Sequence, residues 1–450
     1  MENKTRVQLE RLLYALVKHD RQAIDDIYEQ VEAIDLAEEI EELEDNQLEY
    51  LCSHIDDEKL AEILEESEEE LQTDIIDYLD NKRVLSLFSY MSKDNIVDIL
   101  GDLPIGKRKN LINLMKADDK RIIEQLLGYD EDSAGGLMTT EYIALDENLT
   151  LINALIKIKE IAPKTEVIDT IFVLNNKKQL IGTADLRDIL SSHEELKLSD
   201  IMDDHVISVS PETDQEEVAL TVSKYDLTTI PVVNKNHRIL GIITVDDIID
   251  VIQEEHTEDM LQMHGVNKEE SLDSTLWESI QMRLPWLVVN LATAFLASFV
   301  IKFFEGTIEQ IVALSATMTI VTGMGGNAGN QTLSILIRSI ALGEVHFKDC
   351  FPALKKELCV GIVNGLIVGI ITAIIVYFLY GNIYLGLIIW VAMVGNFIVS
   401  GFFGLLIPII LKALHLDPAL ASSIFLTTAT DILGFFIFLS LANLFLPFLS

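Results

Sequence analysis

The chain contains 450 residues, with 33 basic and 72 acidic side chains and a formal net charge of −39. This length exceeds that of one ordinary domain, so we expect two or more units. The strong negative charge argues against binding to nucleic acid and favours cations as partners, with plain solubility as the alternative explanation.

The charge is confined to one part of the chain. Seven basic and seven acidic residues lie from Arg283 onward, so residues 1–282 hold the other 26 basic and 65 acidic residues and the whole net charge. A soluble acidic region and an apolar region are therefore predicted. The opening segment Met1–Lys4 has no apolar core typical of a signal peptide, and the spacing of the three cysteines (Cys52, Cys350, Cys359) indicates reduced thiols.

Residues 1–131 show apolar positions at helical spacing among Glu and Asp, with almost no glycine or proline before Gly101. This pattern predicts an all-α N-terminal stack of short amphipathic helices, whose handedness stays open. The run from Asp132 to Gly136 then breaks the pattern and marks a boundary.

An internal repeat follows this boundary. Residues 171–175 align with residues 230–234, Gly182–Asp188 aligns with Gly241–Asp247, and Met138 and Met202 open the two copies. Two copies of one α+β unit are predicted, over residues 132–200 and 201–253. The Ile-Pro-Val-Val strand and the segment from Gly241 resemble tandem CBS domains, which sense ligands rather than catalyse. We therefore expect no enzymatic activity.

The resemblance implies a nucleotide site in the second copy. Thr244 and Asp247 match the positions at which the family contacts the ribose of ATP or another adenine nucleotide, whereas Asp185 replaces the threonine in the first copy. Two other roles for Asp247 stay open, as the N-cap of a helix and as a metal ligand.

A long polar connecting helix is expected over residues 254–282. Asp247, Asp250, Glu254 and Glu258 are spaced three and four residues apart, which places four carboxylates on one helical face leading toward the first apolar stretch. A solvated acidic face is the simpler interpretation of this pattern, and coupling to the membrane is the functional one.

The apolar region, residues 283–450, contains five stretches of about the 20 residues that cross a bilayer as a helix. They cover roughly residues 284–304, 308–337, 358–380, 384–411 and 421–447. Basic residues cluster at one set of ends, and the opposite ends carry only Lys302. By the positive-inside rule, the chain is a multi-pass protein of the cell membrane with its N-terminus cytoplasmic and its C-terminus outside. The residues that decide this orientation are Arg283, Arg338, Lys348, Lys355, Lys356 and Lys412.

Two polar features lie within the apolar stretches. The segment Gly323–Gln331 holds four glycines and three carboxamides, which predicts an interrupted helix whose carbonyls and Asn side chains could ligate a cation. Close packing of helices through small residues is the alternative. Asp431 is the only acidic residue expected inside a span, and such residues mark ion paths or proton relays. Hard oxygen ligands with one carboxylate suit Mg²⁺.

The whole layout is similar to the MgtE family of magnesium channels and transporters. This resemblance implies a homodimer in the lipid bilayer with the pore on the dimer axis. The implied pore residues are Gly325, Gly326, Asn327, Asn330, Gln331, Thr427 and Asp431. The implied regulatory Mg²⁺ ligands are Gly136, Asp214, Asp226, Asp247, Asp250, Glu255, Glu258, Asp259 and Asp417, with Glu62, Asp94 and Asp98 in the N-terminal region.

The predicted function is Mg²⁺ uptake through a selective channel or transporter that intracellular Mg²⁺ closes. At low Mg²⁺ the facing carboxylates repel one another, and at high Mg²⁺ bound ions bridge them. The alternatives are a coupled carrier or exporter of divalent cations and a membrane-anchored sensor of metal or nucleotide.

Overall fold

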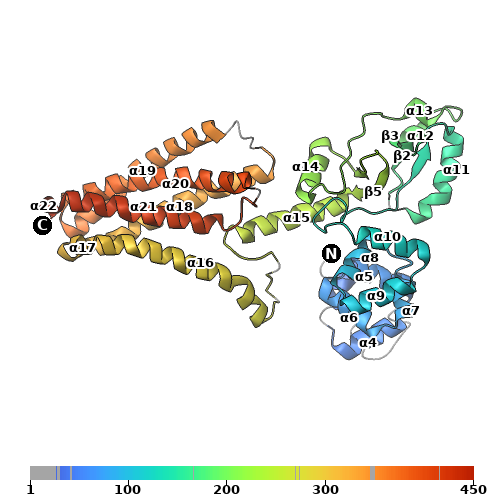
Figure 1. Cartoon of the computed structure of the whole chain (residues 1–450), viewed down its shortest axis with the longest axis horizontal. Helices are drawn as coiled ribbons and strands as arrows, with labels where there is room; N and C mark the ends of the chain where they lie inside the picture. Colours follow the sequence, from blue (N-terminus) through green and yellow to red (C-terminus); the bar gives the residue numbers. More distant parts are fainter. Residues whose placement is uncertain are drawn as a thin grey trace. The chain divides into compact units, whose positions relative to one another are not determined.

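The computed structural model describes residues 27, 31–40, 43–165, 167–268, 270–272, 274–344, 350–414 and 416–449. The chain divides into two compact units, Met1–Asp250 and Val251–Ser450 (Figure 1). The helical pattern expected over residues 1–26, and Lys348 in the orientation argument, fall outside the described residues.

The first unit begins with short helices. They are α3 (Ala33–Ile40), α4 (Asp45–His54), α5 (Asp57–Glu65), α6 (Glu69–Tyr78), α7 (Asn81–Leu87), α8 (Lys93–Asp102), α9 (Ile105–Leu114) and α10 (Ala117–Leu126). Each helix packs against the next but one, from α3 on α5 to α8 on α10. Leu60, Ile75 and Leu87 are fully buried between them. Apolar residues at helical spacing thus form one continuous core, which confirms the expected helical stack.

The repeat forms two small α/β lobes in the same unit. The first lobe contains β1 (Ala144–Asp146), α11 (Leu151–Ile161), the short 3-10 helix η1 (Ala162–Lys164), β2 (Thr170–Leu174), β3 (Leu180–Asp185), α12 (Leu186–Ser191) and α13 (Leu198–Ile201). The second contains α14 (Gln215–Tyr225), β4 (Thr229–Val233) and β5 (Ile239–Thr244). β1 runs parallel to β2, while β2 with β3 and β4 with β5 form antiparallel pairs.

The two lobes exchange their opening segments. Thr139, at the start of the first copy, pairs with Ile242 in β5 through two hydrogen bonds of 2.9 Å. Asp203, at the start of the second copy, pairs with Thr183 in β3 in the same way. Gly241 permits the first crossing, because a Cβ there would lie 2.5 Å from the Thr139 carbonyl oxygen. The repeat seen in the sequence therefore corresponds to a reciprocal pair of lobes.

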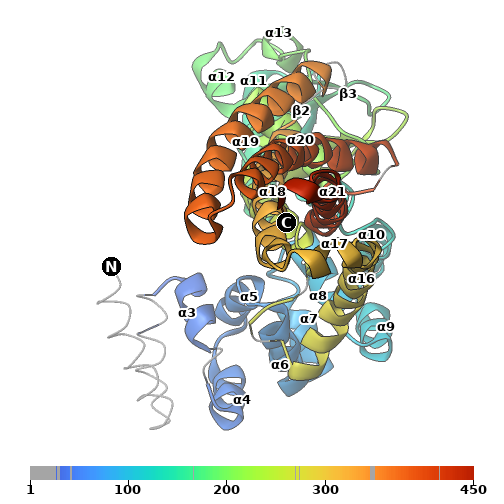
Figure 2. The same ribbon diagram turned by 90° about the vertical axis from the view of Figure 1, so that its left-hand side faces the viewer.

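The second unit is a bundle of long helices. After α15 (Val245–Gln262), which crosses the division between the units, come α16 (Leu276–Phe303), α17 (Glu305–Gln310), α18 (Ala313–Ala341), α19 (Cys350–Tyr380), α20 (Ile383–Ala413), α21 (Ser422–Leu444) and α22 (Leu446–Leu449). Among the described residues, α16, residues 351–380 of α19, α20 and α21 are long and apolar enough to cross a membrane. α20 packs against α18, α19 and α21, and the end-on view shows the bundle (Figure 2).

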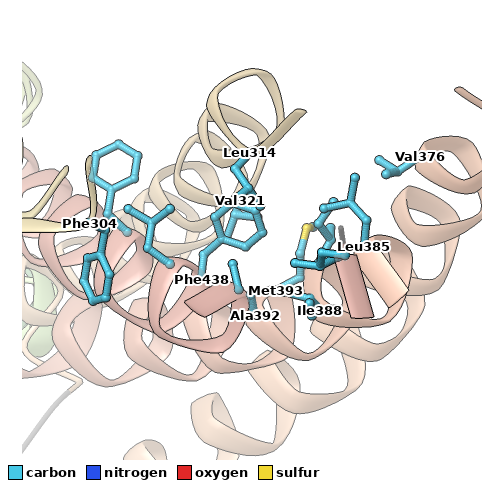
Figure 3. Packing of buried hydrophobic residues seen from close by; sticks show 14 of the residues in the cluster. Phe304, Leu314, Val321, Val376, Leu385, Ile388, Ala392, Met393 and Phe438 are labelled. Carbon is cyan, nitrogen blue, oxygen red and sulfur yellow. The ribbon is translucent and has the colours of Figure 1, made fainter. Parts of the chain in front are cut away.

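The core of the bundle is apolar. Leu314 and Val321 of α18, Ala392 of α20 and Phe438 of α21 are each fully shielded from solvent within one cluster (Figure 3). Much of the outer surface of α16 and α19 is also apolar, as expected for helices in contact with lipid.

Two expectations about helices were wrong. The connecting segment is not one helix over residues 254–282, because α15 ends at Gln262 and α16 begins at Leu276. The glycine-rich segment does not interrupt its helix either, because α18 is continuous through it. The low helix propensity of glycine is overridden here, since a broken turn among apolar helices would leave backbone groups without partners.

Candidate functional site

A polar face runs along α18. Gly323, Asn327 and Gln331 are spaced four residues apart and are exposed, so they lie on one side of the helix. Val321, Gly325 and Gly329 lie on the opposite side and are buried against the bundle. We call Gly323, Asn327 and Gln331 the polar face of α18. Carboxamides without a covering surface are unfavourable in lipid, so this face requires water, an ion or another protein surface.

The glycine-rich segment and α21 lie side by side and run in opposite directions. Asn330 Oδ1 accepts a hydrogen bond of 2.9 Å from Ser423 Oγ. A Cβ at Gly326 would lie 3.9 Å from Thr430 Oγ1, in the residue just before Asp431. Asp431 is half-buried, and Thr427, one turn earlier, is exposed. The predicted pore residues of α18 and α21 are therefore at the same height in the bundle.

The glycines of α18 serve close packing rather than release of carbonyl ligands. A Cβ at Gly325 would lie 2.0 Å from Asn396 Nδ2, and one at Gly329 would lie 2.9 Å from Leu426 Cδ1. The carbonyl oxygens of Val321 and Gly325 accept hydrogen bonds from α20. The packing alternative thus accounts for these glycines, and the oxygen ligands that α18 offers to an ion are its side-chain carboxamides.

In the first unit, α8 places three carboxylates one turn apart. Asp94, Asp98 and Asp102 share a side of α8, and Asp247 and Glu131 lie close enough to Asp98 to raise its pKa. We call these five residues the α8 cluster. It joins the helical stack with the segment before the first lobe and with the start of α15, although these residues are far apart in the chain.

Negative charge prevails in the α8 cluster, because burial and neighbouring carboxylates raise the pKa of Asp102 to about 6 although Arg108 lowers it. Asp94 is buried, and its Oδ1 has no hydrogen-bond partner among the residues that the structure describes. Desolvation and then Asp94 raise the pKa of Asp98 to about 7, even though this side chain still reaches solvent. Desolvation also raises the pKa of Asp247 to about 6. Clustered, partly desolvated carboxylates with a free oxygen fit a hard divalent cation.

A second acidic group lies in the other unit, which we call the α15 cluster: Glu255, Glu258 and Asp259 on α15, and Asp417 between α20 and α21. Desolvation and then the charge of Asp417 raise the pKa of Asp259 to about 7. Desolvation raises the pKa of Asp417 as well, although its Oδ1 accepts a 2.8 Å hydrogen bond from the Ala419 amide. The backbone of α15 also meets the start of α21, where the Ala421 amide donates to the Gln262 carbonyl at 2.8 Å.

Other predicted metal ligands are held in local structure. The Asp214 carboxylate caps α14 by accepting from the Glu216 amide at 2.9 Å, and Asp226 ends that helix in the left-handed conformation with φ 52°. Glu62, Asp214, Asp226 and Asp250 are exposed. Gly136 lies against the backbone of Glu131, where a Cβ would be 2.5 Å from its carbonyl oxygen. Gly136 therefore lies beside Glu131 of the α8 cluster, and the described residues show no such close contact for Glu62, Asp214, Asp226 or Asp250.

The candidate nucleotide residues contact each other. The Thr244 hydroxyl donates to Asp247 Oδ2, and the Thr244 amide donates to the same oxygen at 3.3 Å. Asp247 is the third residue of α15 and accepts from the residue just before the helix, whereas Asp185 occupies the N-cap position of α12 and accepts from the Arg187 amide at 2.7 Å. The structure therefore does not place Asp247 at an N-cap, and its role as a metal ligand stays a prediction.

Sequence reasoning missed several residues that these sites include. Asp102 and Glu131 complete the α8 cluster, and Glu65 lies beside Asp94 while accepting from the Ser92 amide at 2.9 Å. Asp431 is not the sole acidic residue on the apolar helices, because the candidate span within α19 includes Glu357. Glu357 Oε2 accepts from Thr332 Oγ1 of α18 at 2.9 Å. Only the helical spacing of Asp94, Asp98 and Asp102 was a usable signal.

One more group of metal-type ligands occurs in the described part of the chain. Asp203, Asp204 and His205 bring their ligand atoms within 4.8 Å of one another. All three are exposed and consecutive in the chain, and the His205 Nδ1 lies 2.9 Å from Asp204 Oδ1. An exposed acidic turn of this kind is common without a bound ion, so it adds no site.

Comparison with known proteins identifies relatives over most of the chain. The family model for a divalent cation transporter, MgtE, matches residues 318–441, that for the MgtE intracellular N domain matches residues 31–132, and the CBS domain model matches residues 134–195 and 198–254. The chain is 34% identical over 356 residues to the magnesium transporter MgtE of Bacillus subtilis, covering 79% of each protein. It is 34% identical over 343 residues to that of Thermus thermophilus, covering 75% of each.

Solved structures resemble the first unit. The soluble part of a magnesium transporter aligns with a TM-score of 0.53 at 28% identity, covering 56% of this chain and 99% of that one. The cytosolic domain of the Mg²⁺ channel MgtE in complex with ATP aligns with a TM-score of 0.52 at 32% identity, covering 54% of this chain and 99% of that one.

Proposed function

The chain belongs to the MgtE family of divalent cation transporters, and from this membership we propose that it is a magnesium-selective channel for uptake that cytoplasmic Mg²⁺ closes. It is a multi-pass membrane protein. The single observation that carries the proposal is the exposed polar face of α18 beside Asp431, within a bundle of helices whose core is apolar.

The polar face of α18 supports a homodimer. An uncovered stripe of carboxamides on a 29-residue helix suits a helix that lines a water-filled path, and a second copy would cover it from the other side. α18 then serves as the fifth span, although its glycines and carboxamides keep its hydropathy below that of the four other long helices. Asp431, Asn327, Asn330 and Gln331 provide hard oxygen atoms for Mg²⁺, which keeps several of its waters.

Membrane potential suffices to drive entry. A doubly charged ion gains about 4.6 kcal/mol per 100 mV of inside-negative potential, at about 2.3 kcal/mol per unit charge. The proposed orientation places the N-terminus in the cytoplasm and, with five spans, the C-terminus outside. In this orientation the acidic first unit is cytoplasmic, as are the basic residues that flank the spans, such as Arg283 and Lys412.

Closure by cytoplasmic Mg²⁺ is supported by the two acidic clusters. α15 carries Asp247 of the α8 cluster near its start and Asp259 of the α15 cluster near its end. The α8 cluster brings carboxylates of the helical stack close to the start of α15. The α15 cluster brings carboxylates near the end of α15 close to Asp417 in the loop before α21. Because both clusters hold partly desolvated carboxylates with raised pKa values, they repel when unneutralised and would be drawn together by a bound divalent cation.

We also propose the division of the chain and one nucleotide site. The boundaries are residues 1–131, 132–200, 201–253, 254–282 and 283–450, with the connecting part now split between the end of α15 and the start of α16. A relative's cytosolic domain is described in complex with ATP. In this chain Thr244 and Asp247 are the candidates for a ribose contact, and a nucleotide there would have to replace their mutual hydrogen bond.

A coupled carrier is the second candidate, and one observation favours it. Glu357 adds a carboxylate to α19, whose side chain is only 14% exposed and is hydrogen-bonded to Thr332 beside the glycine-rich segment. A carrier coupled to protons needs such titratable groups. Uptake by a carrier would follow the pH gradient across the membrane, whereas uptake by a channel would follow only the Mg²⁺ gradient and the voltage.

The deciding experiment records currents through the full-length protein in lipid patches, with Mg²⁺ as the sole external cation and cytoplasmic Mg²⁺ varied. We expect unitary Mg²⁺ currents whose open probability falls as cytoplasmic Mg²⁺ rises. Flux that requires a pH gradient and shows no unitary currents would replace the channel by the carrier. Currents that ignore cytoplasmic Mg²⁺ would contradict the proposed gating.

A further inference from the structure

Three successive turns of α20 contact three successive turns of α18. Asn396 Nδ2 donates to the Val321 carbonyl at 2.8 Å, and Ser400 Oγ donates to the Gly325 carbonyl at 2.6 Å. One turn further, a Cβ at Gly404 would lie 3.0 Å from the Gly329 carbonyl oxygen. Each pair is 75 residues apart, so the two helices run in the same direction and in strict register.

These contacts are tight and wholly shielded. Asn396 and Ser400 are 0% exposed. The carboxamide of Asn396 occupies the space that side chains at Gly325 and Gly434 would fill, with ideal Cβ positions only 2.0 and 2.9 Å from its Nδ2. Neither glycine can therefore be enlarged without moving Asn396.

Asn396 is a poor choice for packing alone. Its Oδ1 is buried and has no hydrogen-bond partner among the residues that the structure describes. An unpaired buried acceptor is unfavourable, and leucine has a similar shape without it. The donor on Nδ2 is therefore the feature that distinguishes this residue from an apolar one.

The bonds hold the side of α18 that faces away from the polar face. Successive residues of an α-helix are about 100° apart, so Asn327 lies about 200° from Gly325, on the other side of the axis. If α18 slipped by one residue against α20, the direction of Asn327 and Gln331 would turn by about 100°. The hydrogen bonds from α20 thus set which way these two carboxamides point.

We propose that Asn396 and Ser400 are positioning residues that lock the rotation and height of α18, and that this lock gives the polar face its preference for Mg²⁺ over Ca²⁺. The inference rests on the proposed function. Mg²⁺ demands nearly ideal octahedral geometry, with oxygens at about 2.0–2.1 Å, whereas Ca²⁺ accepts irregular shells at about 2.3–2.6 Å. If the polar face of α18 could rotate, its affinity for Mg²⁺ would therefore fall more than its affinity for Ca²⁺.

The test compares uptake of Mg²⁺ and Ca²⁺ by the full-length protein in liposomes of one lipid composition. The variants are Ser400→Ala and Asn396→Leu. The matched control is Thr317→Val, because Thr317 is 1% exposed on α18 and its hydroxyl bonds only within that helix, to the Ala313 carbonyl at 2.9 Å and the Leu314 carbonyl at 3.3 Å. The control loses a buried hydroxyl of the same helix without loosening it from α20.

We expect both variants to raise the Mg²⁺ concentration of half-maximal uptake and to lower the ratio of Mg²⁺ to Ca²⁺ uptake. The change should be about 10-fold to 100-fold, the loss typical when a partner that orients a metal ligand is removed. Thr317→Val should keep the wild-type ratio. Ser400→Cys, which restores a weak donor, should recover part of the ratio.

Each outcome decides a separate question. If the variants lose uptake of both ions in proportion, with an unchanged half-maximal concentration, the contacts are only structural and the inference is wrong. The same holds if Ser400→Ala behaves like Thr317→Val. Should Asn396→Leu fail to fold, Ser400→Ala, which removes one oxygen atom, decides alone. A wild-type protein without Mg²⁺ uptake would overturn the proposed function itself, and this inference with it.

Discussion

The two units treat polar groups in opposite ways. In the first unit, the α8 cluster gathers carboxylates that raise one another's pKa, to about 7 for Asp98, and Asp94 Oδ1 has no hydrogen-bond partner among the described residues. In the second unit, buried polar side chains of the membrane helices mostly have partners across helices, as Ser400 has on Gly325 and Asn330 on Ser423. Water can reach the first cluster, whereas a membrane helix has no solvent to supply missing hydrogen bonds.

This contrast indicates two ways of handling one ion. In a regulatory site, carboxylates without a bound cation repel one another and favour the open channel, and a bound cation favours the closed channel. A path through the membrane has to keep its shape whether or not an ion is present, and the hydrogen bonds from α20 to the backbone of α18 would hold the helix that carries the carboxamides. Four predictions test this contrast between the two units.

The largest effect is expected from Asp431→Asn. Removing the charge should keep the fold but lower Mg²⁺ flux by about 100-fold, since a hydrogen bond to a charged group contributes up to about 3 kcal/mol and each 1.4 kcal/mol is about tenfold. Flux into liposomes measures this, with Glu344→Gln, an exposed acid just beyond α18, as the control of equal charge change. Wild-type flux in a well-folded Asp431→Asn protein would remove Asp431 from the path.

The next effect concerns sensing. Neutralising Asp247, Asp250, Glu255 and Glu258 together should leave an open channel that needs at least about ten times more cytoplasmic Mg²⁺ to close, equivalent to a loss of about 1.4 kcal/mol of coupling. Patch recordings measure the closing concentration.

The matched control for this set neutralises Glu160, Glu194, Glu195 and Glu212, which are exposed and lie outside both acidic clusters. Equal closing concentrations in the two sets would show that the carboxylates on α15 only solvate the protein.

A smaller effect is expected on the stability of the first unit. The soluble part of a magnesium transporter and the cytosolic domain of the channel MgtE were each solved without membrane helices, so we expect the corresponding fragment of this chain to fold as well. Mg²⁺ at about 100 times its dissociation constant should stabilise a fragment of residues 1–253 by about 2.7 kcal/mol, which raises Tm by roughly 5–10 °C. NaCl at the same ionic strength should do far less, since screening cannot bridge chosen carboxylates.

Small-angle scattering should show that the same fragment becomes more compact with Mg²⁺. If NaCl protects it equally and Mg²⁺ brings no compaction, the acidic groups serve solubility and the proposed gating has to be abandoned.

The smallest effect is the pH dependence of that fragment without Mg²⁺. Folding raises the pKa of Asp98 to about 7 and that of Asp247 to about 6, so the folded state binds protons more tightly than the unfolded state. Stability should therefore fall as pH rises from about 4 to about 7, by a total on the order of 2 kcal/mol after allowing for solvent screening.

Urea unfolding at several pH values measures this slope. Saturating Mg²⁺ should flatten it, because the ion binds the deprotonated carboxylates. A fragment whose stability rises over this range without Mg²⁺ would contradict the crowding of the α8 cluster.

Much of the fold was predictable, because it depends on residues near one another in the chain. Apolar spacing along residues 33–126 predicted the helical stack, and the matching segments Gly182–Asp188 and Gly241–Asp247 predicted two copies of one lobe. Hydropathy predicted the apolar helices, and four of them satisfy length and composition in the described residues. The family resemblance is confirmed by the relatives that match all three regions.

The sequence was therefore enough to predict most of the elements, the repeat, the division into an acidic and an apolar part, and the family. It could not predict the connecting segment, the unbroken α18 or the polar groups that meet. The tertiary structure brought Asp94 to Asp247 and Asp259 to Asp417 across more than a hundred residues, and it set Asn396 against Gly325 so that a glycine-rich helix stayed unbroken. The low helix propensity of glycine predicts a break at these positions. In apolar surroundings, however, every backbone group needs a hydrogen-bond partner, which favours an unbroken helix. Because glycine has no side chain, the neighbouring helices can also pack closely against α18.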